Sequence, residues 1–260
     1  MKNIYKKYKK NGFCIIDVFK KKDIEQVKTK ISLKLNKLLK AKKKKFKNNN
    51  LDNYHEIIKN KSVHLKLMSP STRYIKLSDS MIKGINNHII KFILKKEWGH
   101  SKKAITWVGL HKRGEIKKNH TGFRISRPIQ SKRKNINDVA GVHIDLNSGG
   151  ERLKKEDLVT LWIPIIGFSK KYTLNLFSKT HTLNHAKNFI KSIKISFVCK
   201  PSYYKKYKSF RPILKPGQGI LFHPNLMHGG SLNKGIKSRI SIDLRLLNTK
   251  KHSAYKRLFN

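Results

Sequence analysis

The chain has 260 residues, and its 61 lysines and arginines against 14 aspartates and glutamates give a formal net charge of +47 at pH 7. This length suffices for one large domain with a substantial core. Residues 1–8 lack the apolar segment of a signal peptide, and no apolar run is long enough to span a membrane, so we expect a cytoplasmic protein without membrane insertion.

The net charge by itself favours a polyanion, such as nucleic acid, as a partner. However, ten of the 61 basic residues are arginine and the other 51 are lysine, and asparagine and isoleucine are also abundant. This combination is typical of a genome poor in G and C, in which surface positions drift towards lysine. We therefore place compositional drift ahead of nucleic-acid binding, since the sequence has no zinc-finger, recognition-helix or RNP signature.

Two amphipathic helices are predicted in the first part of the chain. Apolar residues recur at helical spacing from Ile24 to Leu38, which predicts a helix over 24–41. A second helix is predicted over 80–97, and Gly99 follows it as a stop signal.

From Ile105 onwards the pattern changes to short strands between turn residues. The segments that alternate or run apolar are 105–111, 123–127, 141–146, 158–165, 173–177, 219–222 and 239–247. Helices followed by many strands indicate an α+β fold in which a β-sandwich or jelly roll carries the site. We expect one domain over 1–260, with a helical part at about 1–104 and a strand-rich core at about 105–250.

The segment 141–146 carries a histidine and an aspartate two residues apart, His143 and Asp145. On a β-strand such residues face the same way, so both side chains can converge on one point. His228 supplies a further histidine downstream, with His223 as its rival. Two histidines and one carboxylate form the facial triad that holds non-haem Fe(II) and leaves three positions open. The alternative is that these are strand histidines and a turn aspartate with ordinary hydrogen bonds.

With Arg239, eleven positions after His228, these residues resemble the Fe(II)/2-oxoglutarate-dependent oxygenase superfamily. Within it the sequence is most similar to the phytanoyl-CoA dioxygenase-like branch, including members found in carbohydrate biosynthesis clusters. The segments that carry this likeness are Tyr8–Asp17 before a helix, Leu161–Pro164 after the His-x-Asp motif, Ser178–His181 in place of a Pro-Gly-Ser-His turn, and Pro216–His223 before the distal histidine. The resemblance covers nearly the whole chain.

The resemblance implies that the core at about 105–250 is a double-stranded β-helix, which is a jelly roll like that of the cupins, with the N-terminal helices packed on one sheet. It also implies a dioxygenase that uses Fe(II), with 2-oxoglutarate and O2 as co-substrates. His143, Asp145 and His228 would hold the metal. Arg239 would pair with the far carboxylate of 2-oxoglutarate through a bidentate fork, and Ser241 would add a hydroxyl donor. The implied reaction is hydroxylation of a small molecule, such as a sugar, lipid or natural-product intermediate, with succinate and CO2 as co-products.

Four further residues are candidates for contacting a small-molecule substrate that carries negative charge. They are Arg124 and Arg127 before the His-x-Asp motif, His181 in the turn, and Arg245 in the last strand. Each has an alternative reading. The first two could be solvated strand ends, His181 an ordinary turn residue, and Arg245 the partner of Asp243 in an ion pair that needs no ligand.

A second hypothesis is a basic module without catalysis, which binds nucleic acid or another polyanion on a cupin-like fold. Its affinity for the polyanion should fall steeply as the salt concentration rises and should not depend on iron. The ordered triad and Arg239 favour the enzyme, whereas the net charge favours the binding module. The sequence carries no indication of an oligomeric state.

Overall fold

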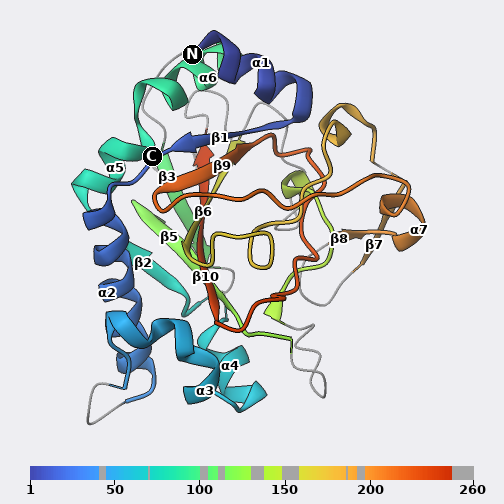
Figure 1. Cartoon of the computed structure of the whole chain (residues 1–260). Coiled ribbons are helices and arrows are strands. Elements are labelled where there is room, and N and C mark those ends of the chain that lie inside the picture. Colours follow the sequence, from blue (N-terminus) through green and yellow to red (C-terminus); the bar gives the residue numbers. More distant parts are fainter. Residues whose placement is uncertain are drawn as a thin grey trace.

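The computed structural model in Figure 1 shows helices in the first part of the chain and strands in the rest. The described residues are 1–40, 45–69, 71–99, 105–110, 115–129, 138–147, 158–185, 187–191 and 197–247. The predicted class, mixed helix and antiparallel sheet, is confirmed. Within these ranges no helix combines the length and the apolar character needed to cross a membrane.

The central element is an eight-stranded antiparallel sheet with the order β1-β9-β6-β10-β3-β4, in which β5 also pairs with β10 and β2 pairs with β5. Strands β7 and β8 form a separate pair. The strands are β1 Phe13–Asp17, β2 Tyr74–Lys76, β3 Ile105–Leu110, β4 Glu115–Lys118, β5 His120–Ser126, β6 Leu158–Ile166, β7 Phe189–Lys191, β8 Phe197–Cys199, β9 Gln218–Phe222 and β10 Arg239–Leu247. Positions 111 and 248–250, which the strand and core predictions included, lie outside the described residues.

The helices precede most of the sheet in the chain. They are α1 Lys2–Asn11, α2 Lys21–Leu38, α3 Tyr54–Ile57, α4 Lys61–Leu67, α5 Asp79–Ile85, α6 His88–Trp98 and α7 Pro201–Tyr204, with 3-10 turns η1 Asn48–Asn53, η3 Asp145–Asn147 and η4 Thr180–Thr182. The helix predicted over 24–41 is present as α2, although position 41 lies outside the described residues.

The helix predicted over 80–97 is wrong in one respect, because the structure has two helices there. Helix α5 ends at Ile85, and α6 begins at His88 after the N-cap residue Asn87, whose side chain accepts a hydrogen bond from the backbone N–H of Ile90. Asparagine side chains compete for backbone hydrogen bonds, so they favour helix ends over helix interiors. The apolar periodicity continues through the break and therefore gave no sign of it.

Strand β10 shows how the sheet acquires one apolar and one polar face. One set of alternating residues packs in the core that the sheet shares with α2, α5 and α6, namely Ile240, Ile242, Leu244 and Leu246. Successive side chains of a strand point to opposite faces. The other set, Arg239, Ser241, Asp243 and Arg245, therefore faces away from the helices and lines a cavity.

A smaller second layer closes this cavity, and it is held by isolated bridges. His143 pairs with His228, and Leu176 pairs with both Phe210 and His228. The strands predicted over 141–146 and 173–177 are therefore wrong as strands. One reason is local: Asp145 begins turn η3, and its N–H donates to the carbonyl of Pro224, which has no N–H to return.

Candidate metal centre

His143 and His228 lie directly opposite each other in the second layer. The N–H of His143 donates to the carbonyl of His228 at 2.8 Å, and the N–H of His228 donates back at 3.0 Å. The two ring centroids are 4.3 Å apart, and both residues are buried. A pair of reciprocal backbone bonds thus fixes two imidazoles side by side.

A second set of hydrogen bonds orients each ring. Nδ1 of His143 lies 2.7 Å from the carbonyl oxygen of Gly141, and Nδ1 of His228 lies 2.9 Å from that of Leu226. A carbonyl oxygen only accepts, so each Nδ1 carries the hydrogen and each Nε2 keeps a lone pair. This is the usual way in which a protein fixes the tautomer of a metal-binding histidine.

The carboxylate of Asp145 completes the cluster. Its Oδ1 lies 3.9 Å from Nε2 of His143 and 3.9 Å from Nε2 of His228. One nitrogen or oxygen atom from each of the three residues lies within 4.8 Å of the other two, and this is the group of potential metal ligands found among the described residues. Its two nitrogens and one oxygen suit non-haem Fe(II). Asp145 reaches this point from turn η3, and the predicted strand does not extend to it.

The electrostatics keep His143 and Asp145 in the protonation state that binds a metal. Burial, with the neighbouring His228, lowers the pKa of His143 to about 3, so its imidazole is neutral at pH 7. Burial alone would raise the pKa of Asp145, but His228, Arg245, His143 and the hydrogen bond from Thr160 together lower it. The hydroxyl of Thr160 donates to Oδ2 of Asp145 at 2.5 Å, which leaves Oδ1 to face the histidines.

Arg239 and Ser241 lie in the same cavity as the three ligands. Nη1 of Arg239 donates to the carbonyls of Tyr172 and Ser231, at 3.1 and 2.9 Å. Its Nε and the hydroxyl of Ser241 are buried and have no hydrogen-bond partner among the described residues. Buried donors without partners are costly, so their presence indicates a ligand that accepts from them. Burial lowers the pKa of Arg239 to about 10, which still leaves it cationic at pH 7.

The structure places two of the four predicted substrate residues at the cavity and the other two away from it. Arg124 and Arg245 line the cavity. Arg127 donates to Asp138 through Nε at 2.9 Å and Nη2 at 3.0 Å, and His181 lies 3.0 Å from the carbonyl of Lys9 through its Nε2. Neither of these two residues lines the cavity beside the triad.

His223, the rival for the distal ligand, also lies away from the metal cluster. Its ring is 5.5 Å from that of His181, and both line a separate hollow near Tyr8 and Lys9.

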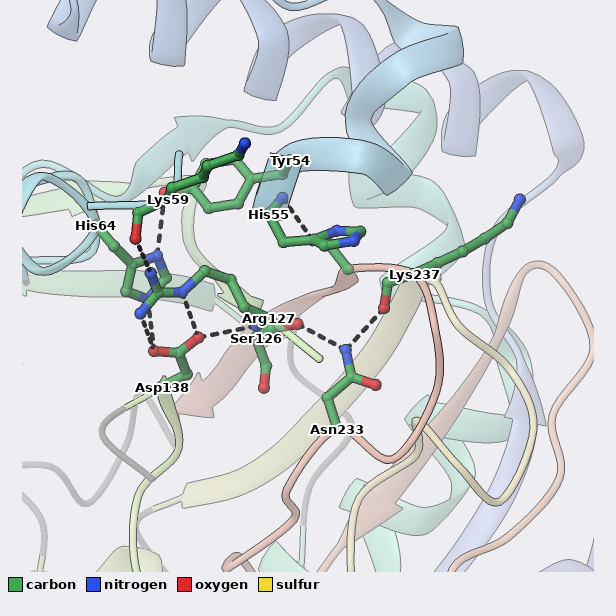
Figure 2. A network of polar contacts seen from close by, with 10 residues as sticks. Tyr54, His55, Lys59, His64, Ser126, Arg127, Asp138, Asn233 and Lys237 are labelled. Carbon is green, nitrogen blue, oxygen red and sulfur yellow. Dashed lines mark hydrogen bonds and ion pairs between the residues drawn. The ribbon is translucent and has the colours of Figure 1, made fainter. Parts of the chain in front are cut away.

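Figure 2 shows the network that holds Arg127. Asp138 accepts two guanidinium bonds and the N–H of Arg127, and its Oδ1 is 3.2 Å from Nε2 of His64. The Nδ1 of His64 is 3.1 Å from the hydroxyl of Tyr54. The network therefore joins helices α3 and α4 to β5 and to the segment that leads to His143. Sequence reasoning missed His64 and Asp138, although Asp138 lies five residues before His143.

Proteins of known structure share this arrangement of helices and strands. The non-heme alpha ketoglutarate dependent carbocyclase SnoK from nogalamycin biosynthesis has a TM-score of 0.58 at 11% identity, over 99% of this chain and 90% of SnoK. The epimerase SnoN in complex with Fe3+, alpha ketoglutarate and nogalamycin RO has a TM-score of 0.55 at 11% identity, over 95% and 83%. EctD from S. alaskensis, with 2-oxoglutarate and 5-hydroxyectoine, has a TM-score of 0.54 at 12% identity, over 96% and 76%.

No protein-family model matches the sequence, and no curated protein sequence matches it either. At identities of 11 and 12% the likeness to SnoK, SnoN and EctD establishes a shared fold. The chain therefore has the fold of the non-haem iron, 2-oxoglutarate-dependent oxygenases. This confirms the fold that the superfamily resemblance in the sequence implies.

Proposed function

We propose that this protein is a non-haem Fe(II)/2-oxoglutarate-dependent dioxygenase. One observation carries the proposal: the cavity that holds the three potential ligands also holds Arg239 Nε and Ser241 Oγ, two buried donors without partners. Two imidazole nitrogens and a carboxylate suit Fe(II), and a guanidinium beside a hydroxyl suits a carboxylate of the co-substrate. SnoN, which shares the fold, was crystallised with Fe3+ and alpha ketoglutarate.

In this proposal His143, Asp145 and His228 hold the iron. Iron with 2-oxoglutarate supplies the oxidising chemistry that activates O2, with succinate and CO2 as co-products. Arg239 binds and orients the far carboxylate of 2-oxoglutarate, and Ser241 adds a hydroxyl donor. Thr160 holds Oδ2 of Asp145 and so directs Oδ1 towards the histidines.

We further propose that residues 1–260 form one domain, in which the main sheet and the bridged second layer are the two sheets of a jelly roll. Membership in the phytanoyl-CoA dioxygenase-like branch belongs to the same proposal, on the sequence segments that carry the resemblance. The expected substrate is a small molecule that is hydroxylated beside the metal. SnoN binds nogalamycin RO and EctD binds 5-hydroxyectoine, which supports a small-molecule substrate.

The test is a visible spectrum of the protein with Fe(II) and 2-oxoglutarate in the absence of oxygen. A weak metal-to-ligand charge-transfer band is expected, and it should be lost in Arg239→Ala and in His228→Ala. His223→Ala is the matched control and should keep the band, since His223 lies outside the cluster. A folded protein that takes up iron but shows no band would overturn the proposal and leave the polyanion-binding module in its place.

A further inference from the structure

The arginines of this lysine-rich chain are concentrated around the cavity. Ten of its 61 basic residues are arginine, and six of these lie among the described residues. Three of the six, Arg124, Arg239 and Arg245, line the cavity, whereas no described lysine does. Lysine supplies a surface charge equally well, so arginine retained against a drift towards lysine indicates a need for its rigid fork of donors.

Three of the six arginines already have a partner or a role. Arg127 is held by Asp138, and Arg239 is assigned to the co-substrate. Arg211 donates to the carbonyls of Thr173 and Leu232 and so fixes the backbone beside Arg239. Of the other three, Arg124 and Arg245 line the cavity, and we refer to these two as the mouth arginines; Arg73 does not line it. The side chains of Arg124 and Arg245 are 30% and 33% exposed, in contrast to the buried Arg239.

The mouth arginines come together from neighbouring strands. Arg124 on β5 lies opposite Ser241 in the β5–β10 pair, and Arg245 on β10 lies opposite Thr160 in the β6–β10 pair. Arg73 directly precedes β2, and its carbonyl accepts from the N–H of Phe123, next to Arg124. Burial and the charge of Arg124 lower the pKa of Arg73 to about 9, which places its guanidinium in the field of this cluster and leaves it cationic at pH 7.

Asp243 accepts from Nε of Arg124 at 2.5 Å, and its charge also acts on Arg73. Arg245 is 3.5 Å from Asp145, but that carboxylate is committed to the metal in the proposed function. Of the other carboxylates that line the cavity, Asp138 is held by Arg127. Asp243 is then the one carboxylate left among the described cavity residues to balance Arg73, Arg124 and Arg245, which leaves two positive charges in excess.

We propose that the mouth arginines bind the phosphate group of the substrate, so that the substrate class is a phosphorylated small molecule. This proposal rests on the proposed function. A phosphate monoester carries between one and two negative charges at pH 7, roughly −1.5 to −2, and its oxygens match the fork of a guanidinium. Because Arg124 and Arg245 flank the residues that hold the co-substrate and Asp145, phosphate bound there would direct the rest of the molecule towards the metal.

The experiment is chemical labelling of arginine with phenylglyoxal, followed by mass spectrometry of the peptides that contain Arg124 and Arg245. The reagent reports guanidinium groups, so the 51 lysines, which attract any anion, give little background. The full-length protein is loaded with Fe(II) in the absence of oxygen, so that Asp145 is held by the metal, and is labelled with and without inorganic phosphate, while chloride keeps the ionic strength constant. We expect phosphate to protect Arg124 and Arg245 from the reagent. In Arg245→Lys, the phosphate concentration that protects Arg124 should rise by about tenfold.

Two controls make the result specific. Lys22→Met removes the same charge from an exposed position on α2 and should leave the protection unchanged. Acetate at equal ionic strength should protect far less than phosphate. Equal protection by acetate would overturn the phosphate assignment, and so would an equal loss of protection in Lys22→Met.

The charge-transfer band of the Fe(II) and 2-oxoglutarate complex separates this proposal from the proposed function. A normal band without phosphate protection overturns the phosphate site and leaves the oxygenase intact. Protection without a band in an iron-loaded protein overturns the oxygenase and, with it, the role of the mouth arginines in binding its substrate. Phosphate protection of Arg124 and Arg245 in the wild-type protein, together with a normal charge-transfer band, supports both proposals.

Discussion

His143 and His228 face each other across a two-residue bridge, with backbone hydrogen bonds of 2.8 and 3.0 Å and ring centroids 4.3 Å apart. Each ring is further oriented by a carbonyl two residues before it, Gly141 for one and Leu226 for the other. The backbone thus sets the position and the tautomer of both rings before any metal arrives. Sites preorganised in this way lose little freedom when the ligand binds.

Removal of a proposed ligand should abolish metal binding. Asp145→Ala and His228→Ala are each expected to weaken Fe(II) affinity by about 100-fold or more, since second-shell changes alone cost about 10–100-fold. Anaerobic titration calorimetry with Fe(II) measures this. His223→Ala should bind as the wild type does. Unchanged affinity in Asp145→Ala would refute the triad.

Thr160 should act on the metal through Asp145. Thr160→Val keeps the shape of the side chain but removes the hydroxyl that donates to Oδ2, so Fe(II) affinity should fall by about 10–100-fold. Thr160→Ser retains the hydroxyl and serves as the matched control. If both variants bind Fe(II) as tightly as the wild type, the hydrogen bond has no part in orienting the carboxylate.

Arg239 should determine the affinity for 2-oxoglutarate and leave iron binding unchanged. Arg239→Lys keeps the charge and removes the fork, and we expect the apparent dissociation constant for 2-oxoglutarate to rise by about tenfold or more. Ser241→Ala should show a smaller rise. The charge-transfer band, titrated with 2-oxoglutarate, gives both constants. A change in Fe(II) affinity of similar size would mean that Arg239 supports the metal site itself.

Asp138 should make stability depend on acid pH. Its hydrogen bonds to His64 and Arg127 outweigh the opposing effect of burial and lower its pKa from the ordinary 3.8 to about 2. A lowered carboxyl pKa contributes stability that is present above the unfolded-state value and is lost as pH falls through the folded-state value. We therefore expect a loss of about 2 kcal/mol between roughly pH 4 and pH 2 from this group.

The test of this prediction is urea unfolding across that pH range. Asp138→Asn should be less stable than the wild type at pH 7, by about 3–5 kcal/mol, because it leaves Arg127 buried without its charge partner. Its stability should also fall less steeply below pH 4. If the free energy of unfolding falls equally in both proteins between pH 4 and pH 2, Asp138 is not the group that causes the loss.

Gly229, next to His228, should tolerate no side chain. Its φ is +107°, and a Cβ there would lie 2.5 Å from the carbonyl oxygen of Gly141 and 3.0 Å from Nδ1 of His143. Gly229→Ala should therefore lower both stability and Fe(II) affinity. Gly99→Ala is the matched control: its φ is also positive, at +72°, but no atom of the described residues lies within 4 Å of the added carbon. It should cost only about 1–2 kcal/mol of stability and leave Fe(II) affinity unchanged. Equal effects of the two substitutions on Fe(II) affinity would exclude the predicted clash.

Periodicity and residue spacing in the sequence were enough to predict part of the fold and part of the candidate site. The alternation in β10 predicts which residues face the core, because a strand must bury every second side chain. The short spacing of His143 and Asp145 placed these two near one another, and the distance to Arg239 favoured His228 over His223. These features are local, or rely on a pattern that recurs in a known superfamily.

The tertiary structure decided what local patterns do not contain. Arg124 lies on β5 and Arg127 directly follows that strand, yet Arg127 is held by Asp138 whereas Arg124 reaches the cavity. His181 is within hydrogen-bonding distance of the carbonyl of Lys9 on α1, a helix that the sequence analysis did not predict. Arg73, which lies outside the predicted core, accepts through its carbonyl from the N–H of Phe123, next to Arg124. Each outcome depends on which distant charge or carbonyl a long side chain can reach, and only the packing of β2, β5 and β10 against one another fixes those distances.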